Sequence, residues 1–304
     1  MTQWSPEWSL TVDGGQDYTN LTLANLTIAS GRTDIYSQPR AGYCNVEIIN
    51  LDLTPIDIDV NDSVTIKVKD STGTFVNVFG GFITDIEVSV DSTGTGGINE
   101  RIRLTALGAL SKLPKTLTEG VLSKDEDGDQ IYTILSQVLF AAWDQLPSSL
   151  TWADYNPTTT WANAANSGLG EIDRPGNYEL TARSSSVTDV YSLVSALATS
   201  GLGYIYENAS GQIGYADSTH RNSYLAANGY VNLSGNHALS QGIRTMRRLG
   251  DLRNKVTITY KANAQVTASD AESIAIYGSQ AQEIQTSLEN GADATSQADF
   301  YLGI

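Results

Sequence analysis

Alternation of apolar and polar residues over the first third of the chain restricts the fold more than any other feature. Val64, Ile66 and Val68 are separated by single polar residues, and this period of two places them on one face of a β-strand. The same pattern recurs in Cys44–Ile48, Phe82–Val90 and Ile102–Ala106. Residues 1–115 are therefore predicted to form a small antiparallel β-barrel or sandwich.

The phase of the alternation also predicts which side chains face the core of this domain. Cys44 shares its face with Val46 and Ile48, so its thiol is expected to be buried and unreactive. Near Asn25 the apolar phase slips, which indicates a bulge or a turn. Two further strands are expected to direct inward the side chains of Phe82, Thr84, Ile86, Val88, Val90, Ile102, Leu104 and Ala106.

Beyond residue 115 the apolar period becomes that of an amphipathic helix. Such a helix is predicted over residues 131–142, and Asp127 and Asp129 lie just before it, where carboxylates can cap free amide groups. Residues 147–177 follow and are rich in Thr, Asn, Gly and Pro. Because a loop of this length is unusual inside a compact domain, we expect it to form an interaction surface outside the core.

A second helix and a hairpin are expected after this loop. The helix is predicted from Val187 to Thr199, and Gly201 is placed to end it. Residues 203–216 contain two short apolar segments around the turn residues 208–211, which is typical of a β-hairpin.

The last part of the chain, from about residue 241, carries a strand and a final helix. Val256, Ile258 and Tyr260 alternate with polar residues. Ala294, Ala298, Tyr301 and Leu302 follow helical spacing from about Gly291 onward. No later segment is available to cover this stripe, so the helix is expected to dock on a partner, unless the natural chain is longer.

Charge and composition narrow the class of function. The formal net charge is −16, and no Lys or Arg follows Lys261. Specific nucleic-acid binding is not expected, because contacts to phosphates require Lys and Arg that displace counterions. No apolar run approaches the roughly 18–20 residues that span a bilayer, so membrane insertion is not expected either. Cys44 is the only cysteine, which rules out an intrachain disulfide.

Candidate catalytic and metal-binding motifs are weak. Ser123–Asp129 resembles the start of a calcium loop, but Ile134 stands where a bidentate Glu is needed, so a solvated helix cap is the preferred interpretation. His220 and His237 lie in predicted loops without the ligand spacing of a zinc site. A Ser–His–Asp triad stays open because triads are set by geometry. We predict no catalytic, cofactor-binding or metal-binding residues, no cofactor, and no enzyme activity.

Trp152 and Trp161 are the candidate interaction residues. Both lie in the predicted loop 147–177, and aromatic side chains are common where proteins bind partners or sugars. The alternatives for this loop are contact with a neighbouring protein and recognition of a glycan on a host surface.

Short segments spread along the chain carry a family resemblance. They are Trp4–Trp8, Asp17–Thr19, Ser30–Ile35, Val78–Ile86, Leu104–Leu110, Gly203–Asp217, Arg253–Tyr260 and Ser273–Gly278. In this order they resemble the minor tail proteins and baseplate-hub proteins of long-tailed bacteriophages, over most of the chain except the loop 147–177. The resemblance implies a hub of tube-like barrels arranged as a ring at the tail tip, and it implies no catalytic residues.

The sequence thus predicts an α+β protein dominated by β-structure. Residues 1–115 are expected to form a tube-like barrel domain, and residues 116–240 a mixed domain with two helices, the long loop and the hairpin. Residues 241–304 are expected to form part of a second barrel. It is expected to be a part only, because the hub proteins that the chain resembles usually continue with more strands.

The expected function is that of a structural subunit of the phage tail tip, within the virion, which joins the tail tube to distal proteins and lets DNA pass. The partners implied are further copies of the chain in a ring, as a trimer by the resemblance, the tail tube or distal tail protein, the tape-measure protein, and other minor tail or fibre proteins. The alternative is a host-surface glycan-recognition module of the tail tip.

Overall fold

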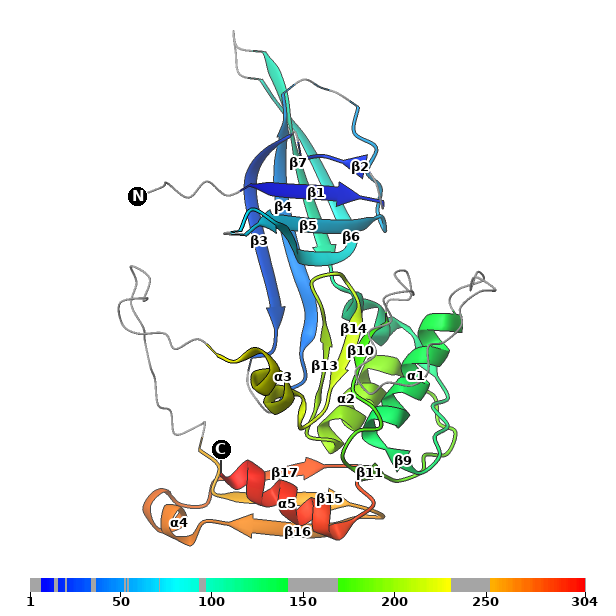
Figure 1. Ribbon diagram of the computed structural model, residues 1–304, viewed down its shortest axis with the longest axis vertical. Coiled ribbons are helices and arrows are strands. Elements are labelled where there is room, and N and C mark those ends of the chain that lie inside the picture. Colours follow the sequence, from blue (N-terminus) through cyan, green and yellow to red (C-terminus); the bar gives the residue numbers. More distant parts are fainter. Residues whose placement is uncertain are drawn as a thin grey trace.

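The computed structural model describes residues 7–13, 16–19, 21–33, 37–51, 53, 55–70, 72–92, 97–141, 169–230 and 252–303. Over these residues the chain is an α+β protein dominated by strands, which confirms the predicted fold class. Figure 1 shows three parts along the long axis: a curled sheet at one end, helices and short strands in the middle, and a small sheet with a helix on it at the other end.

The first part is one antiparallel sheet. Its strands are β1 (Trp8–Val12), β2 (Gln16–Asp17), β3 (Thr22–Gly31), β4 (Arg40–Asn50), β5 (Ser63–Lys69), β6 (Phe75–Ser92) and β7 (Ile98–Leu107), in the order β2-β1-β5-β6-β7-β4-β3. Leu10 of β1 and Cys44 of β4 belong to the same buried cluster although three strands separate them in the sheet. The sheet therefore curls around its core, while its edge strands β2 and β3 are not paired with each other among the described residues.

The register of this sheet confirms most of the predicted core and corrects one strand. The phase slip near Asn25 is a register shift between Leu23 and Asn25 in the β3–β4 pair, and Ile102, Leu104 and Ala106 are buried as predicted. In β6, however, Ile83 is buried and a further shift lies between Ile83 and Asp85. This extra residue changes the phase of the strand, so Phe82 does not face the core as predicted.

Val88 and Val90, also predicted to face inward, are 56% and 62% exposed. They lie near the end of the long β6–β7 hairpin, which extends past the rest of the sheet (Figure 1). Alternation predicts the face on which a side chain lies. It does not predict whether other strands continue far enough to cover that face.

Cys44 is expected to react with thiol reagents only after unfolding. Its side chain is fully buried, and burial raises the pKa of the thiol to about 12. Since the thiolate is the reactive form, labelling of the native protein with a maleimide at neutral pH should be slow, and it should become fast and stoichiometric in denaturant. Rapid labelling under native conditions would show that the register of β4 is wrong.

The described residues of the middle part form one 3-10 helix, three α-helices and several short strands. They are the 3-10 helix η2 (Ala109–Lys115), β8 (Leu117–Thr118), β9 (Asp125–Glu126), α1 (Asp127–Ala141), β10 (Leu169–Ile172), β11 (Glu179–Leu180), β12 (Thr188–Asp189), α2 (Val190–Ser200), β13 (Tyr204–Glu207), β14 (Ile213–Ala216) and α3 (His220–Asn228). The presence of α1 and α2, the end of α2 at Gly201 and the β13–β14 hairpin agree with the prediction. Helix α1 begins four residues earlier than predicted, so Asp127 and Asp129 lie in its first turn and not before it.

Three details of this part differ from the prediction. Strand β10 lies inside the stretch 147–177, and it pairs parallel to β14 with Leu169 and Ile172 buried, so the end of the expected loop belongs to the core. Helix α2 begins later than expected because Asp189 caps it, accepting a hydrogen bond from the Ser192 amide. Asp127, expected to be solvated, is fully buried.

The third part is a small sheet covered by a helix. Its elements are β15 (Lys255–Tyr260), β16 (Ala264–Ser269), α4 (Ala271–Tyr277), β17 (Ala281–Gln285) and α5 (Gly291–Leu302), with the sheet order β16-β15-β17. The apolar stripe of α5 packs within the chain, since Ala294, Ala298 and Tyr301 join the buried cluster that also holds Val256 and Ile258. This corrects the expectation that α5 needs an external partner. The same cluster includes residues of α1 and α2, so the middle and last parts share one core.

Candidate functional site

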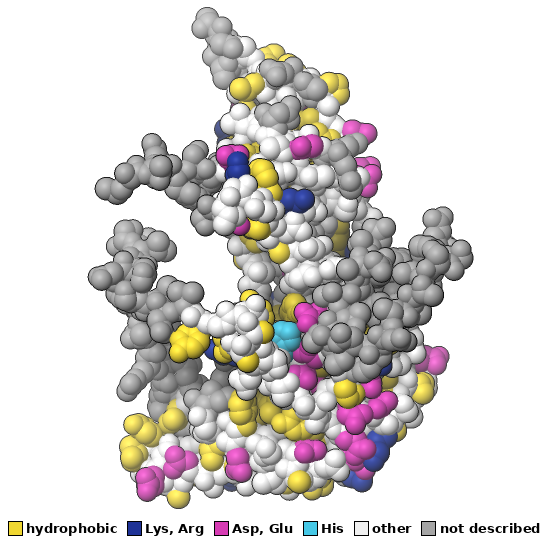
Figure 2. Space-filling view, in the orientation of Figure 1, with side chains coloured by type: hydrophobic (Ala, Val, Ile, Leu, Met, Phe, Trp, Pro, Cys, Tyr) yellow, Lys and Arg dark blue, Asp and Glu magenta, His cyan; other side chains and the backbone are white. Residues whose placement is uncertain are grey.

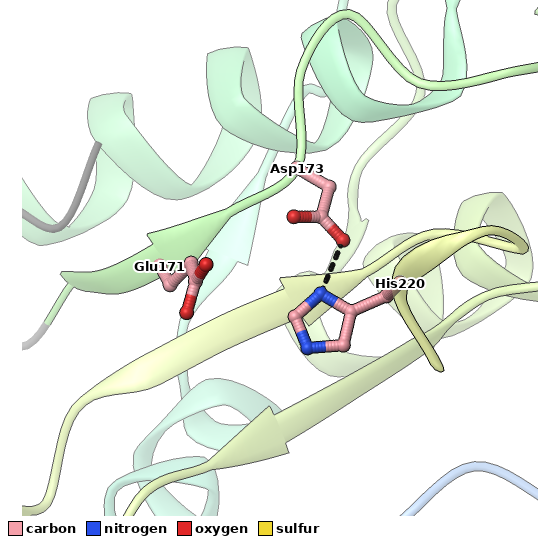
Figure 3. A group of neighbouring side chains, drawn as sticks. All are labelled: Glu171, Asp173 and His220. Carbon is pink, nitrogen blue, oxygen red and sulfur yellow. Dashed lines mark hydrogen bonds and ion pairs between the residues drawn. The ribbon is translucent and has the colours of Figure 1, made fainter. Parts of the chain in front are cut away.

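A group of chemically reactive side chains lies on the β10-β14-β13 sheet. Glu171 comes from β10, Asp173 follows it directly, and His220 is the first residue of α3. One side-chain nitrogen or oxygen atom from each of the three lies within 4.8 Å of the other two. Figure 3 shows the carboxylates on one side of the imidazole ring, whose Nδ1 lies 2.7 Å from Oδ2 of Asp173.

Strand pairing and a tight turn place these residues. The parallel pairing of β10 with β14 brings the chain at Asp173 beside the end of β14, where the Asp217 amide donates to Oδ2 of Asp173 at 3.0 Å. The Asp217 carboxylate then accepts hydrogen bonds from the amides of Thr219 and His220, at 2.7 Å and 2.9 Å. This cap turns the chain back over the sheet and holds the imidazole against Asp173.

The electrostatics of the group are dominated by carboxylates. Burial raises the pKa of Asp173, while the Asp217 amide and His220 act in the opposite direction. Tyr206 of β13 lies beside them, and its pKa is raised by burial first and then by the negative charges of Glu171 and Asp173. Figure 2 shows the histidine side chain at the surface with acidic side chains next to it. The group can therefore attract and hold a cation.

A second polar site joins the curled sheet to the middle part. Its central residue is Glu207 at the end of β13, whose carboxylate accepts hydrogen bonds from the backbone amides of Gly42 in β4 and Leu110 in η2. Burial raises the pKa of this carboxylate, and the two amides lower it. One charge-assisted hydrogen bond thus joins the middle part to the curled sheet at Gly42, and the other ties β13 to η2, the helix that follows the sheet.

Further contacts surround Glu207 at this junction. The Gln38 side chain donates to the carbonyl of Gly203 at 3.1 Å and accepts from the amide of Ile205 at 3.1 Å. Asn77 of β6 donates to the hydroxyl of Ser210 in the β13–β14 turn at 2.9 Å. The junction is therefore specific in its pairing, which is what a fixed angle between the two parts requires.

The face of the curled sheet opposite its core carries paired charges. Glu47 of β4 lies between Arg101 and Arg103 of β7, with contacts of 2.8 Å and 3.2 Å. Arg103 also contacts Glu87 at 3.1 Å, and Arg101 lies 3.5 Å from Asp91. Three carboxylates thus surround two guanidinium groups, so this network carries an excess of negative charge.

The residues singled out from the sequence have different outcomes. Trp152, Trp161 and His237 lie outside the described residues. His220, judged an ordinary loop residue, is brought together with two carboxylates that precede it by 47 and 49 positions in the sequence. The available signal was the Glu-x-Asp spacing at 171–173, which is too common to identify a site alone. Of the segment compared with a calcium loop, Asp125, Glu126 and Asp129 also lie within 4.8 Å of one another.

Among the described helices, none is both long enough and apolar enough to cross a membrane. No protein-family model matches the sequence, and the search of curated proteins found no match.

Comparison with solved structures identifies the fold. The crystal structure of the tail protein from Neisseria meningitidis MC58 matches 97% of this chain and 75% of its own, with 13% sequence identity and a TM-score of 0.55. A 43 kDa tail protein of prophage MuSo2 from Shewanella oneidensis matches 98% of this chain and 76% of its own at 14% identity, with a TM-score of 0.48. The prophage tail protein gp18 from Listeria monocytogenes EGD-e matches 96% of this chain and 76% of its own, with 10% sequence identity and a TM-score of 0.49. The match to the Neisseria protein confirms the resemblance at the level of the fold.

Proposed function

We propose that this chain is a structural subunit of the tail tip of a long-tailed bacteriophage. In this proposal several copies form a ring that joins the tail tube to distal tip proteins and leaves a channel for DNA. The observation that carries it is the fold shared with a tail protein over nearly the whole chain. Proteins of one fold can differ in function, so the proposal also rests on features of this chain itself.

The curled sheet supplies the first of these features. Strands β3, β4, β6 and β7 form a broad antiparallel surface whose outer face is polar and held by the Glu47–Arg101–Arg103 network. A surface of this kind suits the wall of a water-filled channel. The excess of carboxylates in the network agrees in sign with the net charge of the chain, −16. An acidic wall repels DNA phosphates over about a Debye length, roughly 8–10 Å, so DNA would pass without being bound.

The junction around Glu207 supplies the second feature. A ring closes only if each copy holds its parts at a constant angle, and the cross-contacts of Glu207, Gln38 and Asn77 fix the curled sheet on the middle part. The proposed partners are other copies of the chain as a trimer, the tail tube or distal tail protein, the tape-measure protein, and other minor tail or fibre proteins.

A reconstruction of the intact tail tests this proposal. The chain is expected on the tail axis, in a closed ring with the Glu47–Arg101–Arg103 face toward the lumen and more carboxylates than basic groups lining it. The proposal fails if the chain lies off the axis as a peripheral fibre, or if the lumen is lined mainly by basic groups. Saturable binding of host cell-wall fragments that is lost in a Trp152→Ala, Trp161→Ala double variant would instead favour glycan recognition.

A further inference from the structure

We propose that Glu171, Asp173 and His220 bind a divalent transition-metal ion, with Zn²⁺ as the ion to test. The three potential ligand atoms lie within 4.8 Å of one another. In a tetrahedral zinc site with bonds of about 2.0–2.2 Å, ligand atoms are about 3.4 Å apart. Small rotations of the Glu171 and Asp173 side chains are enough to close that difference.

The contact between His220 and Asp173 aims one ring nitrogen at the carboxylates. Nδ1 lies 2.7 Å from Oδ2 of Asp173. With the ring proton on Nε2, Nδ1 carries a lone pair that can coordinate a metal between the ring and the carboxylates, in place of the hydrogen bond. Figure 3 shows Nδ1 of the ring directed at the Asp173 carboxylate, with the Glu171 carboxylate nearby.

The ligand set indicates which kind of ion fits. Imidazole nitrogen is a good ligand for zinc and its neighbours among the transition metals, whereas calcium and magnesium prefer sites made of oxygen alone. Two carboxylates and one imidazole leave a coordination position for water. The two carboxylates bring negative charge to the group, and a dication would compensate it.

Two further observations point to a missing ligand. The Glu171 carboxylate makes no hydrogen bond or ion pair with another residue in the described part of the chain, although the residue is only partly exposed. Helix α3 is nine residues long and has no buried side chain. A helix this short is marginal without tertiary packing, and His220 at its first position is its link to Asp173. A metal at this point would fasten α3 to the sheet.

The test uses the full chain, freed of metal with a chelator and titrated with Zn²⁺ in a calorimeter. One Zn²⁺ per chain is expected to bind at micromolar concentration. His220→Gln and Glu171→Gln should each weaken binding at least about tenfold. His237→Gln is the matched control, because it removes the only other histidine, and it should leave the affinity unchanged. Glu171→Gln also guards against misfolding, since it removes no contact seen among the described residues.

A second readout connects the ion to α3. Zn²⁺ should slow amide hydrogen exchange of Tyr224 and Leu225 in the natural chain and should have no such effect in Glu171→Gln. The proposal is overturned if no saturable binding occurs, or if His220→Gln and Glu171→Gln bind like the natural chain. Loss of binding only in Glu126→Gln would also overturn it, by placing the ion at the Asp125–Glu126–Asp129 group.

Discussion

Replacement of Asp127 by alanine is expected to lower the free energy of unfolding by about 3–5 kcal/mol. Asp127 is fully buried, and its carboxylate accepts hydrogen bonds from the amides of Asn177 and Tyr178, both at 2.8 Å, and from the Tyr215 hydroxyl. Alanine leaves three donors without a partner, of which the Tyr215 hydroxyl is fully buried and the two amides partly buried, and each unsatisfied group costs about 1–3 kcal/mol. Urea unfolding of the two proteins at about pH 4, where the Asp127 carboxyl is protonated in the folded state, measures the difference.

Asp127→Asn is the matched control for this prediction. Its carbonyl oxygen can accept from both amides, and its NH₂ group can donate to the Tyr215 hydroxyl oxygen. The asparagine variant is therefore expected to remain within about 1 kcal/mol of the natural chain at acidic pH. If alanine and asparagine destabilise the protein equally, the hydrogen bonds of Asp127 do not stabilise the core as described.

The difference in stability between Asp127→Asn and the natural chain is expected to depend on pH. Burial raises the pKa of Asp127 from 3.8 to about 6. Between about pH 4 and pH 6 the Asp127 carboxyl is protonated in the folded state and ionised in the unfolded chain. Its contribution to the free energy of unfolding is therefore complete below about pH 4 and is lost as the pH rises through 6. Two pKa units correspond to about 3 kcal/mol. The stability of Asp127→Asn relative to the natural chain should therefore rise by up to about this amount between pH 4 and pH 7.

Replacement of Glu207 by alanine is expected to uncouple the curled sheet from the rest of the molecule. The amides of Gly42 and Leu110 lose their acceptor, which costs about 2–4 kcal/mol for two partly buried donors. Because the loss falls on the junction and not inside either core, calorimetry should show the single transition dividing into two. The middle and last parts should lose less stability than the curled sheet's docking, because within them only the Leu110 amide loses its acceptor.

Gly80→Ala tests the same junction by a different route. A Cβ atom at Gly80 would lie 2.5 Å from the backbone of Ser210 and Gly211, so the β13–β14 turn would have to move away from β6. Gly303→Ala is the control, because there the nearest atom lies 3.5 Å from the added carbon. A single unchanged transition in both Glu207→Ala and Gly80→Ala would show that this contact does not couple the two parts.

Much of the fold follows from local patterns in the sequence. Cys44, Val64 and Leu104 were predicted to be buried because a period of two places them on one face of their strands, and this is confirmed. The end of α2 and the start of α5 are predicted within a few residues, because Gly201 marks the first and the apolar stripe from about Gly291 marks the second. Such signals depend only on neighbours in the chain.

The sites depended on pairings between distant segments. The bulge after Ile83, the burial of Asp127 and the partners of Glu207 follow from which strands and turns meet, and no local period encodes that.

By itself, the sequence determined the β-dominated class, the inward faces of most strands and the positions of the main helices, because periodicity and turn chemistry act over a few residues. Only the tertiary structure brought His220 to Glu171 and Asp173. Their meeting requires the parallel pairing of β10 with β14 and the turn at Asp217. The pairing depends on the packing of the whole middle core and not on any one segment.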